Sequence, residues 1–198
     1  VVHSSGVLRD GLIRGGAAAD RSADVWKAKA LSAWWLHKHT MRDDLRVFIS
    51  FSSITAAIGN PGQSAYGAAN RFLDGLMTER TRRGAHGLSI RWPAISSVGM
   101  AAVGILLGES GKEGAVASGT IGPAEVAQVL ESSLRGSMPS SGTGPILTIV
   151  PRMVLAMMGG SRVWSQFSGV VLARIPFWPF PRSHFSVHLS SHIFSYPC

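Results

Sequence analysis

The 198-residue sequence contains a single cysteine, Cys198, at its C-terminal end. One cysteine excludes a framework of internal disulfide bonds. The N-terminal segment lacks the basic, apolar and cleavage regions of a secretory signal peptide. The apolar run 146–158 is interrupted by Pro151 and Arg152, and it is shorter than the roughly 20 residues that a membrane-spanning helix needs. We therefore expect a soluble protein of the cytoplasm with no membrane partner.

Acidic residues are absent from the last third of the chain. Residues 132–198 hold five arginines and no Asp or Glu, whereas residues 1–131 hold 14 Lys or Arg against 11 Asp or Glu, so +5 and +3 give the net charge of +8. A strongly basic protein raises the question of a nucleic-acid partner. These arginines are scattered, without a helical stripe or the interleaved aromatic residues on which single strands stack. We expect no nucleic-acid partner.

Two glycine motifs of common enzyme classes are missing. No G-x-S-x-G sequence occurs, which excludes the nucleophile elbow of an α/β-hydrolase. No G-x-G-x-x-G occurs either, so the chain lacks the glycine-rich turn by which an α/β domain usually binds the phosphates of a dinucleotide.

Four spaced polar residues stand out among what is present: Lys29, Ser53, Tyr66 and Asn70. Reduction of a ketone by hydride builds negative charge on the carbonyl oxygen, so a proton donor and a second hydrogen-bond donor must already point at it. A tyrosine can be the proton donor, and a nearby lysine would favour its phenolate and lower its pKa from about 10. The hydroxyl of Ser53 would hold the substrate oxygen, and the amide of Asn70 would order the proton relay.

Local patterns place these residues at one edge of a sheet. Residues 45–53 are typical of a buried strand, residues 59–64 of a turn, and residues 66–83 keep the apolar spacing of a helix that Gly84 ends. Ser53 would then close the strand, and Tyr66 and Asn70, four residues apart, would share one face of the helix. In open α/β sheets, ligands bind at the carboxyl ends of the strands. Each of the four residues alone is more simply a cap or a surface polar group, so their combination carries the prediction.

Four segments resemble the catalytic half of a polyketide synthase ketoreductase domain, a branch of the short-chain dehydrogenase/reductase superfamily. They are VVHSSGVLRDGLI (1–13), KALSAWWLH (29–37), FISFSSITAAIGNPGQSAYGAANRFLDGL (48–76) and GLSIRWPAISSVGMA (87–101). Most short-chain dehydrogenases have lysine four residues after the tyrosine. The synthase ketoreductases are similar to this chain instead, with asparagine at that position and the lysine upstream.

The resemblance implies a Rossmann-like, doubly wound parallel α/β fold and NADPH-dependent reduction of a β-ketoacyl thioester to a β-hydroxyacyl thioester. The substrate would be tethered to an acyl carrier domain, within a multidomain synthase of secondary metabolism. It implies Tyr66 as proton donor, Ser53 as oxyanion holder, Lys29 as the cation and Asn70 as organiser of the relay.

The same resemblance implies that residues in two loops and at the entrance of the lid contact the cofactor. The residues are Ser5, Gly6, Trp92, Pro93, Gly99 and Met100. The usual glycine after the tryptophan is replaced here by Pro93, which lacks a backbone N–H. Asp10 ends an LRD sequence that is similar to the family's Leu-Asp-Asp signature. By this resemblance, Asp10 and Ile58 imply the same configuration of the alcohol product.

The resemblance also implies that three strands and the glycine-rich loop precede residue 1, so that the chain is a fragment. We expect residues 1–150 to be the catalytic portion, with a lid at about 99–119, a helix at 123–134 and a last core strand at 146–150. Residues 151–198 are expected to be an irregular tail. Its His184, His188 and His192 recur every fourth residue, but the many serines and the lack of a nearby acid argue against a metal site. The alternative to an active reductase is a non-catalytic remnant that cannot bind the cofactor alone.

Overall fold

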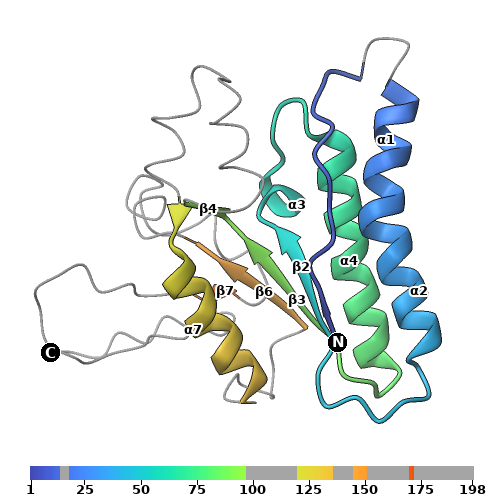
Figure 1. Ribbon diagram of the computed structural model, residues 1–198, viewed down its shortest axis with the longest axis vertical. Helices are drawn as coiled ribbons and strands as arrows, with labels where there is room; N and C mark the ends of the chain where they lie inside the picture. The colour runs from blue at the N-terminus through green and yellow to red at the C-terminus, as the bar shows by residue number, and fades with distance from the viewer. Residues whose placement is uncertain (14–17, 97–119, 136–144, 151–169, 172–198) are drawn as a thin grey trace, which may run out of the picture. The chain divides into compact units, whose positions relative to one another are not determined.

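The computed structural model describes residues 1–13, 18–96, 120–135, 145–150 and 170–171 (Figure 1). The chain divides into two compact units. Unit 1 comprises Val1–Trp92 with Gly144–Leu147, and unit 2 comprises Pro93–Thr143 with Thr148–Cys198. The predicted lid at 99–119 and the tail from 151 on, apart from Val170–Val171, lie outside the described residues.

Unit 1 is built on parallel strands. Strand β1 (Val2–His3) pairs with β2 (Ile49–Ser53), and β2 pairs with β3 (Leu88–Trp92) in a register that sets Ser53 opposite Trp92. Strand β6 (Ile146–Ile149) follows, and the backbone N–H of Ser89 donates a 2.6 Å hydrogen bond to the carbonyl of Pro145. Within unit 1, the strand order β1-β2-β3-β6 is that of a parallel α/β sheet. Within unit 2, Thr148 and Ile149 of β6 pair in parallel with β7 (Val170–Val171). The predicted fold class is confirmed.

Helices pack against these strands within unit 1. Helix α1 (Ala18–Trp26), the π-helical turn η1 (Lys27–Leu31) and helix α2 (Ser32–His39) run on without a break, and α4 (Ser64–Arg82) lies beside them (Figure 1). The core between α2, α4 and β2 is formed by apolar residues at helical and strand spacing: Ala33, Phe48, Leu73, Leu76 and Met77.

The predicted helix at 66–83 is confirmed as α4, which begins two residues earlier and ends before Gly84. Gly84 adopts φ +76°, a conformation that favours glycine and stops the helix. The predicted turn contains Gly59 and Gly62, both also at positive φ. The short helix α3 (Thr55–Ile58) was not predicted, because four residues are too few to show a helical period.

The predicted strand at 45–53 is shorter in the structure, since β2 begins only at Ile49. Arg46 is exposed, so the segment before Phe48 runs at the surface rather than inside the sheet.

Unit 2 contains a parallel pair of short strands, β4 (Ala94–Ile95) and β5 (Thr120–Ile121), and helix α7 (Pro123–Leu134). The predicted helix at 123–134 is confirmed at both ends. Proline at its first position has the φ angle that a helix requires and loses no hydrogen bond there. Among the described residues, no helix has the length and apolar character needed to cross a membrane.

Candidate active site

Ser53 ends β2 at the carboxyl edge of the sheet. Its side chain is largely buried, and its Oγ accepts a 3.2 Å hydrogen bond from the backbone N–H of Thr55. This contact fixes the turn from β2 into α3, while the hydroxyl proton remains available for donation to another oxygen. The placement at the strand end agrees with the sequence-based expectation.

Lys29 is buried, with 2% of its surface exposed, so it is not a solvated helix charge. It lies in the π-helical turn η1, a local widening of the helix that is frequent at functional sites. Its Nζ donates to the carbonyl oxygens of Phe51 (3.0 Å) and Ser5 (3.3 Å). The same ammonium lies 5.4 Å from the ring centroid of Tyr66. Two backbone carbonyls therefore hold the cation against the tyrosine.

Tyr66 and Asn70 lie one turn apart on α4. Asn70 is completely buried, and its Nδ2 donates a 2.9 Å hydrogen bond to the carbonyl of Tyr66. The hydroxyl of Ser52 donates to the carbonyl of Asn70 at 3.2 Å, which ties this turn of the helix to β2. The Oδ1 atom of Asn70 is buried without a hydrogen-bond partner among the described residues. A buried acceptor without a partner is costly unless a ligand or water completes it.

The pKa of Tyr66 is raised above 10, in contrast to the lowered pKa that the sequence suggested. Burial is the largest cause, the nearby carboxylate of Asp10 adds to it, and hydrogen bonding with the side chains of Asn70 and Ser53 opposes it. The phenol is therefore fully protonated near neutral pH. Burial also lowers the pKa of Lys29 from 10.5 to about 8. The cation lies beside the ring as expected, but burial is the largest influence on the pKa of the phenol.

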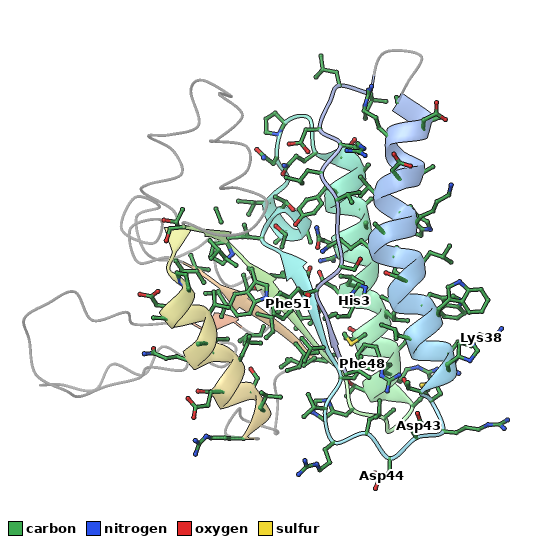
Figure 2. All side chains as sticks on the ribbon, viewed as in Figure 1. His3, Lys38, Asp43, Asp44, Phe48 and Phe51 are labelled. Atoms are coloured by element: carbon green, nitrogen blue, oxygen red, sulfur yellow. The ribbon has the colours of Figure 1, made fainter. Side chains whose placement is uncertain are left out.

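Two of the predicted cofactor-contact residues of unit 1 lie beside this cluster, Ser5 through its carbonyl bond to Lys29 and Trp92 through its register opposite Ser53. Ser5 donates its hydroxyl to the carbonyl of Ala28 (2.7 Å), which anchors the loop containing Gly6 to the lysine helix. His3, near the start of that loop (Figure 2), is within 2.8 Å of the Ser32 hydroxyl, and burial together with the charge of Lys29 lowers its pKa to about 4.

Trp92 ends β3 beside Ser53. It is 4% exposed, its ring packs against Phe51 at 5.2 Å between centroids, and its Nε1 is a buried donor without a partner among the described residues. Pro93 is buried at the start of unit 2. Gly99 and Met100, the remaining predicted contacts, lie outside the described residues.

Sequence reasoning missed the clamp that holds the loop at residues 8–13. The amide of Gln63 donates a 2.8 Å hydrogen bond to Asp10, and the N–H of Gly11 donates to the carbonyl of Gly62 at 2.9 Å. A cavity of about 240 Å³ lies behind this loop and includes Tyr66 in its lining. Two loops far apart in the sequence meet here, and their spacing gave no sign of it. Ile58, half of whose surface is exposed, has no such contact.

The parallel sheet, its packed helices and the tyrosine at the sheet edge define a Rossmann-like α/β fold. Residues 1–97 match the KR domain family. This matched part of the chain is that of a polyketide synthase ketoreductase domain, as the resemblance had implied.

Relatives and solved structures agree on this family. The first ketoreductase of the tylosin polyketide synthase is 28% identical with a TM-score of 0.61, over 81% of this chain and 35% of that one. An A-type ketoreductase from a modular polyketide synthase is 29% identical with a TM-score of 0.58, over 69% of this chain and 28% of that one.

Among curated proteins, the phenolphthiocerol synthesis polyketide synthase Pks15/1 of Mycobacterium bovis is 33% identical over 177 residues, or 89% of this chain and 8% of that protein. A Mycobacterium tuberculosis relative named as an inactive synthase, Pks1, is also 33% identical over 177 residues, 10% of its length. The chain thus spans a tenth or less of these relatives.

Proposed function

We propose that this chain carries the catalytic centre of a ketoreductase that reduces a β-ketoacyl thioester, held on an acyl carrier domain, to a β-hydroxyacyl thioester with NADPH. The observation that supports this most directly is the meeting of Lys29, Ser53, Tyr66 and Asn70 at one sheet edge. The Lys29 ammonium lies 5.4 Å from the Tyr66 ring, Asn70 is bonded to the Tyr66 carbonyl, and Ser53 lies at the carboxyl end of β2. Family membership supports the reaction class.

Tyr66 is the proton donor in this proposal. Its raised pKa keeps the phenol protonated until the substrate oxygen gains charge, and the phenol then releases its proton to that oxygen. Ser53 donates its hydroxyl to the same oxygen and stabilises the developing charge. Lys29 stabilises the phenolate left behind, and Asn70 holds the helix turn from which Tyr66 projects.

The residues around the cluster fit a nicotinamide cofactor, which supplies the hydride when bound. An ammonium has three N–H donors, and Lys29 uses two of them on carbonyls, which leaves one for a ribose hydroxyl. Trp92 contributes a buried indole N–H without a described partner at the same edge. Ser5 and Gly6 would contact the cofactor from the opposite loop. The acceptors and donors are thus of the type that a nicotinamide riboside needs.

The absence of a G-x-G-x-x-G motif from the sequence favours a second candidate, a non-catalytic remnant that needs another polypeptide segment to bind the cofactor. A fluorescence titration of the purified chain with NADPH, repeated with NADH, separates the two. Saturable binding with a preference for NADPH is the result expected of the reductase. Failure of both cofactors to bind would contradict it and support the remnant.

A further inference from the structure

A polar layer lies between α4 and the sheet, where a parallel α/β fold usually buries apolar side chains. The register sets Ser50 opposite Ser89 and Ser52 opposite Arg91, and all four residues are buried. Because side chains alternate along a strand, these four share one face of the sheet. Asp74 of α4 contacts this face.

The strongest contact in this layer is a buried ion pair. Arg91 donates from Nε to Oδ2 of Asp74 at 2.8 Å, with 5% and 2% of the two side chains exposed. Ser89 donates from Oγ to the other carboxylate oxygen, Oδ1, at 2.7 Å. Both oxygens of Asp74 are therefore occupied by donors from β3. Buried ion pairs contribute little net stability, but charge-assisted hydrogen bonds are strongly directional.

This ion pair lies one helical turn along α4 from Asn70, and Asn70 lies one turn from Tyr66. Tyr66, Asn70 and Asp74 follow one another at four-residue intervals, so they lie along one face of α4. Asn70 is bonded to the carbonyl of Tyr66, and Ser52 is bonded to the carbonyl of Asn70. A rotation or slide of α4 about Asp74 would displace all three residues together. Displacements of about 1 Å can slow an enzyme roughly 100-fold.

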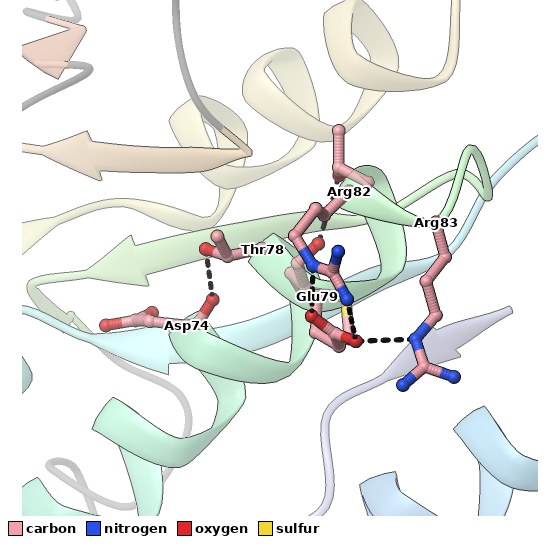
Figure 3. A network of polar contacts seen from close by, with 7 residues as sticks. Asp74, Thr78, Glu79, Arg82 and Arg83 are labelled. Atoms are coloured by element: carbon pink, nitrogen blue, oxygen red, sulfur yellow. Dashed lines mark hydrogen bonds and ion pairs between the residues drawn. The ribbon is translucent and has the colours of Figure 1, made fainter.

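We propose that Asp74 and Arg91 are positioning residues, whose ion pair fixes the rotation and depth of α4 against β3 and so holds Tyr66 and Asn70 in place for reduction. The proposal rests on the proposed function. A charged pair elsewhere on α4 provides the contrast. Glu79 binds Arg82 and Arg83 at the exposed end of the helix (Figure 3). Those contacts touch no strand.

The test uses the ultraviolet absorbance of tyrosinate, which reports on Tyr66 without any need for activity. The chain has only one other tyrosine, Tyr196, so a Tyr196→Phe background leaves Tyr66 as the sole signal. In that background the double variant Asp74→Met/Arg91→Met removes both charges while keeping apolar volume, a replacement that usually preserves stability. Ser89→Ala, which removes one hydrogen bond, is a milder second variant. Glu79→Gln is the control.

Loosening of α4 admits water to Tyr66, so the burial-raised pKa of the phenol is expected to fall toward 10 in the double variant and by less in Ser89→Ala. Glu79→Gln is expected to leave it unchanged. Where the wild type turns over, kcat should fall at least about 10-fold with KM for the cofactor unchanged. An unchanged tyrosinate titration in Ser89→Ala and in a folded double variant would overturn the proposal. A wild type without turnover would count against the proposed function alone.

Discussion

At the scale of single residues, Lys29 is a charged group that the fold buries, where desolvation disfavours its charge. The ammonium is buried and its pKa falls to about 8, so keeping it charged at neutral pH costs free energy. Its hydrogen bonds go to two backbone carbonyls, and no carboxylate is its partner among the described residues. Such a residue is retained for function more readily than for stability.

Substitution of Lys29 by Met is expected to separate activity from stability. Reduction should fall about 100-fold or more, because the phenolate of Tyr66 loses its stabilising cation. The free energy of unfolding at pH 7 should stay the same or rise by up to about 2 kcal/mol, since a desolvated charge is removed. Urea unfolding and NADPH consumption measure the two effects.

The pH dependence of the same variant gives a second check. Between about pH 8 and 10.5 the folded wild type loses the Lys29 proton before the unfolded chain does, so wild-type stability should rise with pH relative to Lys29→Met. If the free energy of unfolding of Lys29→Met at pH 7 were lower than that of the wild type by more than about 1 kcal/mol, this would contradict the inference that the buried ammonium destabilises the fold.

At the scale of elements, helix α4 carries two of the four proposed catalytic residues, Tyr66 and Asn70, together with contacts that hold them. Periodicity predicted α4 and α7 well, because apolar side chains recur at helical spacing and Gly84 and Pro123 mark an end and a start. The π-helical turn at Lys29 could not be predicted, since nothing in the local sequence distinguishes it from an ordinary helical turn. This turn contacts the loop at Ser5 through two hydrogen bonds, from Lys29 to the Ser5 carbonyl and from the Ser5 hydroxyl to the Ala28 carbonyl.

Substitution by alanine is expected to have opposite effects on stability at Gly75, within α4, and at Gly87, which follows it. A Cβ at Gly75, inside the helix, meets nothing within 4 Å, so Gly75→Ala should stabilise the protein by about 0.5–1 kcal/mol. A Cβ at Gly87 would lie 2.8 Å from the carbonyl oxygen of Met77, so Gly87→Ala should cost about 1–3 kcal/mol. Chemical denaturation measures both, and equal effects would contradict the packing of α4 against the segment before β3.

At the scale of the whole molecule, the site arises from segments that the sequence keeps far apart. Spacing and resemblance suggested the four proposed catalytic positions, and the strand-turn-helix pattern predicted where Ser53 and Tyr66 lie at the sheet edge. The direction of the Tyr66 pKa shift could not be predicted from the sequence, because it depends on burial that only the assembled layers create. The Asp10–Gln63 clamp and the Asp74–Arg91 pair likewise join elements whose contact no local pattern reveals.

Histidines with lowered pKa values should make the fold sensitive to acid. Burial is the largest cause of lowered pKa values at His3, His37 and His86, to about 4 in the first case. The unfolded chain binds these protons near pH 6.5 and the folded chain only at lower pH, so stability is complete above about pH 6.5 and is lost as the pH falls toward 4. His3 alone should account for about 1–2 kcal/mol of this loss, discounted for solvent screening.

Urea midpoints at pH 7.5 and 5, compared between wild type and His3→Asn, measure this contribution of His3. Identical pH slopes in the two proteins would show that His3 is not the source.

The proposed role of Tyr66, beside Lys29 and Ser53, is delivery of the proton to a substrate carbonyl. Its most direct test is NADPH consumption by the purified chain with trans-1-decalone or a short β-ketoacyl thioester, compared with Tyr66→Phe at equal folded concentration. We expect turnover in the wild type and a loss of about 100- to 10,000-fold in Tyr66→Phe, with unfolding midpoints unchanged. Turnover that persists in Tyr66→Phe would contradict the assignment of this phenol as the proton donor.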